Sequence, residues 1–296
     1  MASLRDIRQK IKSVKTIHQI TNAMRMMSTA KLSRAIESVN RTKPYVNKLL
    51  SLARNIKLMI PDFQHPALEE REVNKITTII IGGERGLCGG FNQELNTFAL
   101  KEVKKVDLEK QELFVIGQKA IRFFQYSNIP MAKEFATMNV KELETELFTL
   151  SKELYNQYKA HKTDKVNLIY TSYISSINHP VLCNQLLPIP KNSDLLEKSK
   201  DDSDESSEES ILNATYDFYP SPEEIFDQIL PRYMFNSLLQ AVIESIAAEQ
   251  SSRMMAMTSA TDRANEKLDS LRLELNRSRQ AQITQELNEV IAGSQT

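Results

Sequence analysis

The sequence contains little glycine, no tryptophan and two cysteines. Its 296 residues include 7 glycines, too few for collagen-like, propeller-like or turn-rich all-β architectures, which need glycine at many tight turns. Cys88 and Cys183 are too few for a disulfide scaffold, and no cysteine–histidine cluster has the spacing of a zinc site. No apolar run approaches the roughly 18 to 20 residues that span a bilayer. We therefore expect no disulfide, no metal site and no transmembrane helix.

Glycine and proline are also unevenly distributed. Residues 1–43 and 232–292 contain neither, whereas five of the seven glycines fall between Gly82 and Gly90. Because these residues are the strongest helix breakers, their absence permits one very long helix at each end of the chain. Ser221-Pro222 followed by Glu224 is typical of a helix start, so the second helix is expected from there to about residue 292.

Apolar residues in the segment 4–60 recur at intervals of three and four, which predicts a helix with one apolar stripe. With a shift of phase after Val14, the expected stripe comprises Leu4, Ile7, Ile11, Val14, Ile17, Ile20, Met24, Met27, Ala35, Val39, Val46, Leu49, Ala53, Ile56 and Ile60. The C-terminal stripe is interrupted and is expected to end with Met257, Ala264, Leu268, Leu271, Leu275, Leu287 and Val290. Narrow stripes favour an antiparallel coiled coil of the two terminal helices. Two separate bundle helices are the alternative.

The middle of the chain alternates between strand and helix patterns. The β-branched run KITTIII at 75–81 predicts a buried strand, and further strands are expected over 113–116, 166–173 and 181–187. Helices are expected over 91–106, after Gly117 and over 140–159. This alternation predicts a small α/β, Rossmann-like domain with a largely parallel sheet. The expected division is therefore a helix over 1–60, an α/β domain over 61–220 and a helix over 221–296.

Charge is balanced overall but segregated along the chain. Residues 1–43 hold ten Lys and Arg against two acids, whereas residues 191–227 hold three against twelve. The run DDSDESSEES at 201–210 has no apolar residue, so we expect a disordered loop over about 191–210. A basic helix attracts nucleic acid or an acidic protein surface. No aromatic residue precedes Tyr45, and this lack of stacking groups weakens the nucleic-acid alternative.

The run GGERGLCGGFN at 82–92 is the strongest candidate for chemistry. It follows an expected strand and precedes an expected helix, the context of a phosphate-binding loop. It lacks both the lysine followed by Ser or Thr of a Walker A loop and the G-x-G-x-x-G fingerprint. Cys88 has no histidine linked to it in sequence that would act as its base. We expect no catalytic residue and no cofactor, although a small α/β enzyme with helical arms stays open at this point.

Three separated blocks resemble one family in the correct order. LRDIRQKIKSVKTIHQITNAMRMMSTAKLSRA at 4–35 resembles the first helix of the γ subunit of F-type ATP synthase, and ERGLCGGFN at 84–92 resembles that family's central loop. MMAMTSATDRANEKLDSLRLELNRSRQAQITQELNEVIAG at 254–293 is similar to its last helix. The resemblance implies a non-catalytic central rotary shaft that couples ion-driven rotation of the c-ring to ATP synthesis or hydrolysis in the β subunits. A basic coiled-coil nucleic-acid-binding protein is the alternative.

The resemblance also implies partners and contacts. The partners would be three α and three β subunits around the shaft, the ε subunit and the c-ring, with no nucleic acid and only a peripheral relation to the membrane. Met24, Lys31 and Arg34 would face the acidic lever segment of β, and Gly86 and Cys88 would lie near the foot of the shaft. Near its tip, the contact residues would be Arg279, Gln280, Thr284 and Glu286. The polar start MASLRDIRQKIKSV at Met1 favours the cytoplasmic face of a bacterial inner membrane, with an organelle inner membrane as the alternative.

Overall fold

The structure is a computed structural model that describes residues 4–60, 65–68, 71–189 and 221–293. The acidic loop expected over 191–210 lies outside these residues. Contacts divide the chain into two units. We call one the helix pair, made of residues 1–31, 87–89 and 250–296, and the other the sheet unit, made of residues 32–86 and 90–249.

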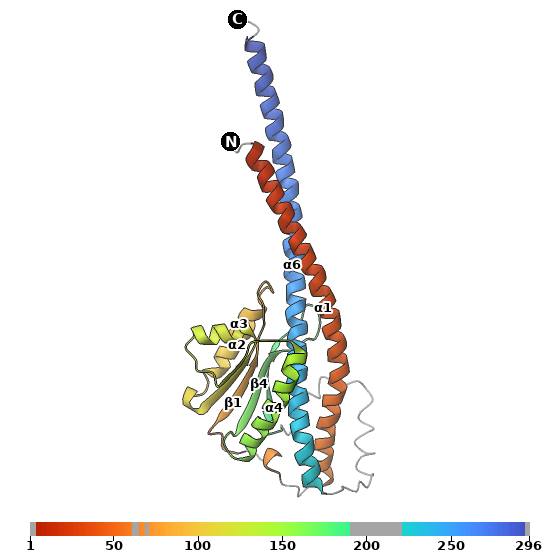
Figure 1. Ribbon diagram of the computed structural model, residues 1–296, viewed down its shortest axis with the longest axis vertical. Helices are drawn as coiled ribbons and strands as arrows, with labels where there is room; N and C mark the ends of the chain where they lie inside the picture. Colours follow the sequence, from red (N-terminus) through yellow and green to blue (C-terminus); the bar gives the residue numbers. More distant parts are fainter. Residues whose placement is uncertain (1–3, 61–64, 69–70, 190–220, 294–296) are drawn as a thin grey trace. The chain divides into compact units, whose positions relative to one another are not determined.

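Two long helices dominate the secondary structure (Figure 1). Helix α1 spans Leu4–Met59 and helix α6 spans Pro222–Gly293, which are 56 and 72 residues. Both are several times longer than the average globular helix of about 11–12 residues. The Ser221 hydroxyl accepts a hydrogen bond from the Glu224 N–H at 3.2 Å and so caps α6. The two predicted terminal helices are confirmed.

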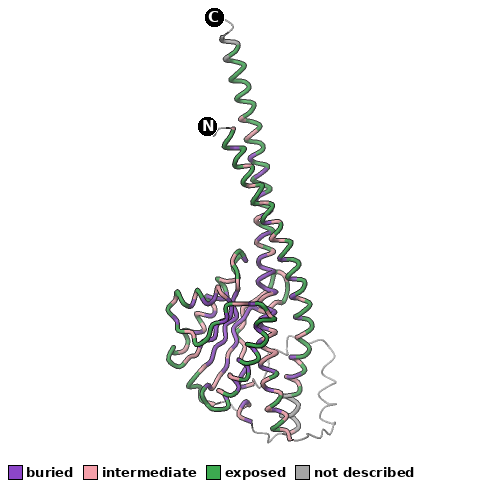
Figure 2. Tube along the Cα trace, viewed as in Figure 1, coloured by how far each residue is buried: buried purple, intermediate pink, exposed green. Residues whose placement is uncertain are grey.

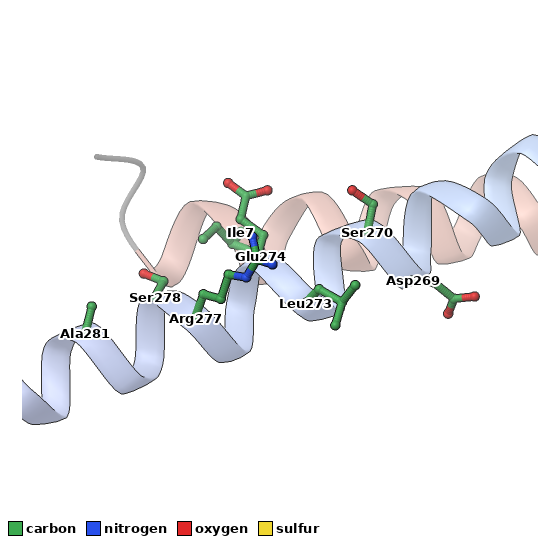
Figure 3. Close-up of a pocket in the computed structure, with 8 residues that line it drawn as sticks. All are labelled: Ile7, Asp269, Ser270, Leu273, Glu274, Arg277, Ser278 and Ala281. Atoms are coloured by element: carbon green, nitrogen blue, oxygen red, sulfur yellow. The ribbon is translucent and has the colours of Figure 1, made fainter.

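In the helix pair, α1 and α6 run antiparallel. The Thr261 hydroxyl of α6 donates to the Thr21 hydroxyl of α1 at 2.9 Å. Nearer the N-terminus, Ile7 of α1 and residues between Asp269 and Ala281 of α6 line an open groove of about 840 Å³ (Figure 3). Residue numbers therefore rise along α1 as they fall along α6. This confirms the predicted antiparallel coiled coil.

The contact stripe of α1 in the helix pair keeps one phase throughout. Its buried and half-buried positions continue every three or four residues through Leu4, Ile7, Ile11, Val14, His18, Thr21, Arg25 and Ser28. The expected shift of phase is wrong, because Ile17, Ile20 and Met27 are 52%, 54% and 60% exposed. A continuous two-helix contact requires an unbroken repeat of about 3.5 residues, so position on the helix outweighs side-chain hydrophobicity. Figure 2 shows the exposed outer sides of both helices.

The sheet unit contains five strands in the order β3-β2-β1-β4-β5. They are β1 Ile76–Ile81, β2 Gln111–Ile116, β3 Lys133–Phe135, β4 Lys165–Thr171 and β5 Val181–Leu187. The pairs β1–β2, β1–β4 and β2–β3 are parallel and β4–β5 is antiparallel, so the largely parallel sheet is confirmed. Strand β3 was not expected, because three residues at a sheet edge are too few to show a strand pattern.

Helices cover both faces of this sheet (Figure 1). They are α2 Phe91–Val103, α3 Gln118–Tyr126 and α4 Val140–Lys159, with the short helices η1 Pro66–Leu68 and η2 Leu108–Lys110. Ile80 of β1 packs in the cluster with α2 and α3, whereas Ile79 and Ile81 pack in the cluster with α4, α1 and α6. Successive strand residues point to opposite faces. Because both faces are covered, all residues of β1 from Thr77 to Ile81 are buried, and the strand ends in three consecutive isoleucines instead of alternating apolar and polar residues.

Backbone crowding at the ends of β1 and β2 explains one of the glycines. Gly117 has φ 100° and ψ 126°, a conformation that side chains rarely adopt. Its N–H donates to the Phe135 carbonyl at 2.8 Å, which joins β2 to β3. A Cβ at Gly117 would lie 2.7 Å from the Gly82 carbonyl oxygen. Only glycine fits here, because both the backbone angle and the contact exclude a side chain.

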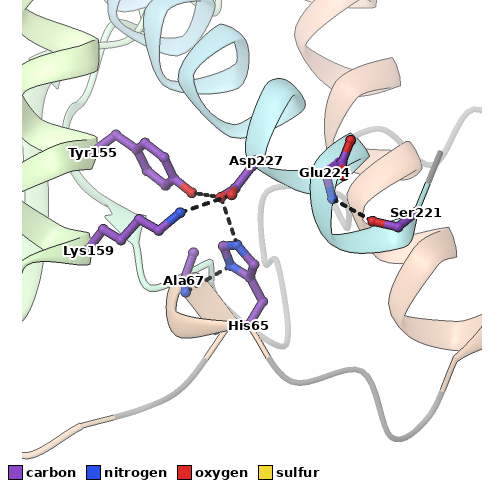
Figure 4. Close-up of polar contacts among 7 residues, drawn as sticks. All are labelled: His65, Ala67, Tyr155, Lys159, Ser221, Glu224 and Asp227. Carbon is purple, nitrogen blue, oxygen red and sulfur yellow. Dashed lines mark hydrogen bonds and ion pairs between the residues drawn. The ribbon is translucent and has the colours of Figure 1, made fainter.

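A polar cluster around Asp227 fixes the start of α6 within the sheet unit (Figure 4). The carboxylate accepts from Lys159 Nζ at 2.9 Å and from the Tyr155 hydroxyl, both on α4. It also accepts from Nε2 of His65 at 3.1 Å. The Ala67 N–H donates to Nδ1 of His65 at 3.2 Å, so the neutral ring carries its proton on Nε2. One carboxylate therefore connects α6, α4 and His65, the residue directly before η1.

The cluster also changes the acidity of its members. Burial alone raises the pKa of Asp227, but hydrogen bonds from Tyr155, Lys159 and His65 outweigh it and lower the pKa from 3.8 to about 2. Burial lowers the pKa of His65 and outweighs the opposing effect of Asp227. Both shifts favour an ionised Asp227 beside a neutral His65 at neutral pH.

We expect Gly117→Ala to lower the free energy of unfolding by at least about 2 kcal/mol, because the new side chain adds backbone strain and overlaps the Gly82 carbonyl. Urea unfolding followed by circular dichroism measures this. Gly86→Ala is the matched control, since a Cβ there meets only the flexible end of Lys119, at 3.8 Å. Equal stability of the two variants would contradict the steric argument.

We expect stability to fall as the pH is lowered from about 4 to about 2, and Asp227→Asn to remove much of this dependence. The pKa of Asp227 is about 2 in the folded chain and 3.8 ordinarily, so unfolding takes up a proton in this range and acid favours the unfolded state. Unfolding curves at a series of pH values test this. Asp269→Asn, on an exposed side chain of α6, is the control and should keep wild-type stability at neutral pH. An Asp227→Asn chain as stable as wild type at pH 7 would exclude the proposed role.

Candidate partner-binding surface

The exposed side of α1 in the helix pair carries an apolar face. Ile17, Ile20 and Met27 follow one another at intervals of three and seven, so their side chains share one side of the helix. Each is at least half exposed, whereas large apolar side chains are usually buried. Met24, at the same spacing, is half-buried. An apolar face of this kind is typical of a surface that meets another protein.

The contact between α1 and α6 in the helix pair is narrow and includes small polar side chains. On α1 it includes Thr21 and Ser28, which are 8% and 2% exposed. Thr261 bonds to the Met257 carbonyl at 2.7 Å as well as to Thr21. Small side chains let two helices approach closely but leave their larger apolar neighbours outside the contact. The sequence predicts a narrow contact stripe on α1. Which apolar side chains remain exposed depends on the phase of that stripe around the helix.

Basic side chains accompany this face. Lys31 is exposed at the end of the α1 stretch that belongs to the helix pair, and Arg34 is exposed on the α1 stretch of the sheet unit. Exposed lysine and arginine on an otherwise acid-poor segment attract acidic protein surfaces. All three α1 residues expected to contact a partner, Met24 included, are therefore at least partly accessible.

The glycine-rich loop is divided between the units. Gly86 is half-buried in the sheet unit, and Leu87–Gly89 belong to the helix pair. Leu87 and Gly89 have positive φ angles of 61° and 58°. Between them, the Cys88 side chain is turned inward and is only 2% exposed, whereas Leu87 is 66% exposed. Of the two expected contact residues here, Cys88 is thus buried within its own chain, and Leu87, which sequence reasoning passed over, presents the exposed side chain.

The segment of α6 over residues 279–288 is exposed on all sides. All side chains from 279 to 288 are exposed, including the expected contact residues Arg279, Gln280, Thr284 and Glu286. Ile283, Leu287 and Val290 form an exposed apolar stripe, at 47%, 56% and 69%. The expectation that Leu287 and Val290 belong to the intramolecular stripe is wrong, because α1 begins at Leu4 and pairs with α6 around Asp269–Ala281. The apolar spacing on this segment therefore indicates a surface for another molecule.

The glycine-rich loop and the start of α2 differ from a phosphate-binding site. The first turn of α2, where a phosphate loop would place its anion, holds Glu94 beside Gly90, and a carboxylate there repels phosphate. His65 and Asp227 bridge secondary-structure elements, as described above. Across the described residues, no group of three or more His, Cys, Asp or Glu side chains is arranged to hold a metal ion. None of the helices in the described segments is both long and apolar enough to cross a membrane.

Sequence comparisons identify relatives over the whole chain. A protein-family model described as ATP synthase matches residues 3–296. The ATP synthase gamma chain of Histophilus somni (strain 129Pt) is 34% identical over 297 residues, covering 99% of each chain. That of Heliobacterium modesticaldum is 36% identical over 298 residues, again with 99% of each chain covered.

Solved structures show the same fold at lower identity. The rotor of the Euglena gracilis mitochondrial ATP synthase aligns with a TM-score of 0.61 at 17% identity, over 95% of this chain and 98% of that one. A chain of the central stalk and c-ring of the Tetrahymena thermophila mitochondrial ATP synthase aligns with a TM-score of 0.55 at 20% identity, over 81% and 99%. With the full-length sequence matches, the chain belongs to the family of ATP synthase gamma chains.

Proposed function

We propose that this chain is the central rotary shaft of an F-type ATP synthase, coupling ion-driven rotation to ATP synthesis or hydrolysis in the β subunits. The observation that carries the proposal is the full-length match to gamma chains, with 99% of both chains covered. Two features of the structure support it. The helix pair has a thin internal contact, and apolar and basic side chains remain exposed around it.

The proposed partners are three α and three β subunits, the ε subunit and the c-ring. A shaft that turns past three equivalent faces needs contacts that are individually weak. Exposed apolar side chains on one helix face, such as Ile17 and Ile20, make non-directional contacts that suit such sliding. Exposed basic groups such as Lys31 add attraction to acidic segments of β at modest cost on separation.

The chain itself is proposed to be non-catalytic, with ATP chemistry confined to β. The Glu94 carboxylate at the start of α2 and the inward position of Cys88 support this. We further propose that the assembled complex works at the cytoplasmic face of a bacterial inner membrane, with an organelle inner membrane as the alternative. The bacterial relatives named above favour the first. The nucleic-acid alternative gains no support from any relative.

Reconstitution with cognate α and β subunits tests the function directly. We expect size-exclusion chromatography to give a complex of three α, three β and one copy of this chain. ATP hydrolysis by that complex should exceed hydrolysis without the chain and should be sensitive to azide. Failure of the folded chain to join α and β would overturn the proposal, and salt-dependent binding to duplex DNA would then support the alternative.

The proposed contact residues at the end of α6 give a sharper test. We expect Arg279→Ala with Gln280→Ala to lower ATP turnover of the assembled complex about fivefold without unfolding the chain. Both side chains are exposed, so the helix pair loses no packing, and about 1 kcal/mol of lost contact energy corresponds to about that factor. Glu266→Ala with Lys267→Ala, two exposed positions on the same helix, is the matched control. Equal turnover in the two double variants would remove these residues from the contact.

A further inference from the structure

The carboxyl ends of β1 and β4 form the position where sheets of this kind usually bind ligands. The chain leaves β1 towards β2 and β3 on one side of the sheet, and β4 lies on the other side of β1. At such a switch in strand order, open α/β sheets leave a crevice beyond the strand ends. Anionic ligands are commonly held there by backbone N–H groups.

Here, two carboxylates of α6 lie at that position. Beyond the end of β1, the Glu84 N–H donates to Oε2 of Glu249 at 3.3 Å. Beyond the end of β4, the Ser172 hydroxyl donates to Oε2 of Glu244 at 2.8 Å. Glu244 and Glu249 are only 5% and 3% exposed. A carboxylate from the chain itself thus accepts the kind of backbone hydrogen bond that a bound anion accepts in related sheets.

Two neighbouring contacts complete the arrangement. The last residue of β4, Thr171, donates its N–H to the Ser245 hydroxyl oxygen at 3.3 Å. The other oxygen of Glu244 accepts from Nε2 of Gln240 at 2.8 Å. Both oxygens of the Glu244 carboxylate therefore have donors. Burying a carboxylate without hydrogen bonds costs free energy. These bonds therefore strongly favour the one position of α6 relative to the strand ends in which both oxygens are hydrogen-bonded.

The polar contacts differ in kind from the rest of the contact between α6 and the sheet. Below them, α6 contributes the buried apolar residues Phe226, Leu230, Met234, Leu238 and Val242. Apolar packing is non-directional and resists a turn of the helix about its own axis only through the fit of its side chains. Hydrogen bonds to carboxylates are directional and stronger than neutral ones. The two carboxylates therefore add a directional constraint on the angle of α6 about its axis to the constraint that the apolar fit supplies.

We propose that the sheet serves as a clamp on the shaft, with Glu244 and Glu249 as positioning residues that transmit torque between the five-stranded sheet and α6. The ligand position of a Rossmann-like sheet is occupied by side chains of the chain's own last helix. The proposal rests on the shaft function and concerns the efficiency of coupling. It requires that the contacts at Glu84 and Ser172 stay closed throughout rotation.

The test uses the complete cognate ATP synthase in membrane vesicles, with ATP hydrolysis and ATP-driven ion pumping measured in parallel. For Glu244→Ala with Glu249→Ala, we expect hydrolysis within twofold of wild type and ions pumped per ATP at least threefold lower. A merely structural role would lower both readouts together through loss of assembled complex. Either a parallel loss or an unchanged ratio would overturn the proposal.

Conservative and control variants sharpen the comparison. Glu249→Gln should couple better than Glu249→Ala, because an amide oxygen still accepts from the Glu84 N–H. Glu244→Gln should be intermediate, because both Glu244 oxygens accept hydrogen bonds and the amide NH₂ group cannot. The control Glu223→Ala with Glu224→Ala removes two exposed carboxylates from the same helix and should pump like wild type.

A cross-link tests the clamp even if the alanine variant fails to fold. Ser172→Cys with Glu244→Cys places one thiol on each side of the contact between Ser172 and Glu244. Because cysteine is shorter than glutamate, the two sulfurs cannot be assumed to reach each other directly, so a short bis-thiosulfonate reagent is used to bridge them. We expect the bridge to form and to leave both hydrolysis and pumping at the level of the wild type treated with the same reagent. Loss of activity on bridging, restored by reductant, would show that the contact must open and would overturn the proposal. If the wild-type chain fails to support hydrolysis with α and β, the shaft function itself fails, which distinguishes the two outcomes.

Discussion

The continuity of α6 is the constraint on which the other features depend. This one helix supplies residues 222–249 to the sheet unit and residues 250–293 to the helix pair. Its internal proline is Pro231 and its last residue is Gly293, so residues 232–292 contain neither of the strong helix breakers. Its side chains must therefore suit two very different neighbours in succession. The change of neighbour is visible in its pattern of burial. Between 241 and 253 nearly every residue is buried, whereas further on burial recurs every three or four residues, at Met257, Thr261, Ala264, Leu268 and Leu271.

These two kinds of contact correspond to two mechanical requirements of a shaft. In the sheet unit, α6 is held by a large apolar core and by polar bonds at Asp227, Glu244 and Glu249. In the helix pair, the contact is narrow and much of each helix stays exposed. A firmly held segment suits the transfer of torque. An exposed segment suits repeated weak contacts with a surrounding ring, because little of its surface is used internally.

Much of the fold was predictable because it follows from local rules. The absence of glycine and proline predicted the terminal helices, and the β-branched run at 75–81 predicted the central strand β1. Three motif blocks resembling one family predicted the function. The short edge strand β3 was not predictable, because its three residues lack a pattern of their own and depend on pairing with β2. The phase of the α1 stripe was also missed, since hydrophobicity favoured Ile17 and Ile20 over Thr21.

The sequence by itself determined the long helices and the longer strands, because helix breaking, strand propensity and capping act over a few neighbouring residues. Only the tertiary structure decided which apolar side chains stay exposed, since the phase of α1 depends on a partner helix more than 200 residues away, as the Thr21–Thr261 bond shows. The same holds for the carboxylates at the strand ends. Glu244 and Glu249 look like ordinary helix-surface acids in the sequence. Their burial follows from the folding of α6 across the switch point of the sheet, a long-range packing event that no local pattern records.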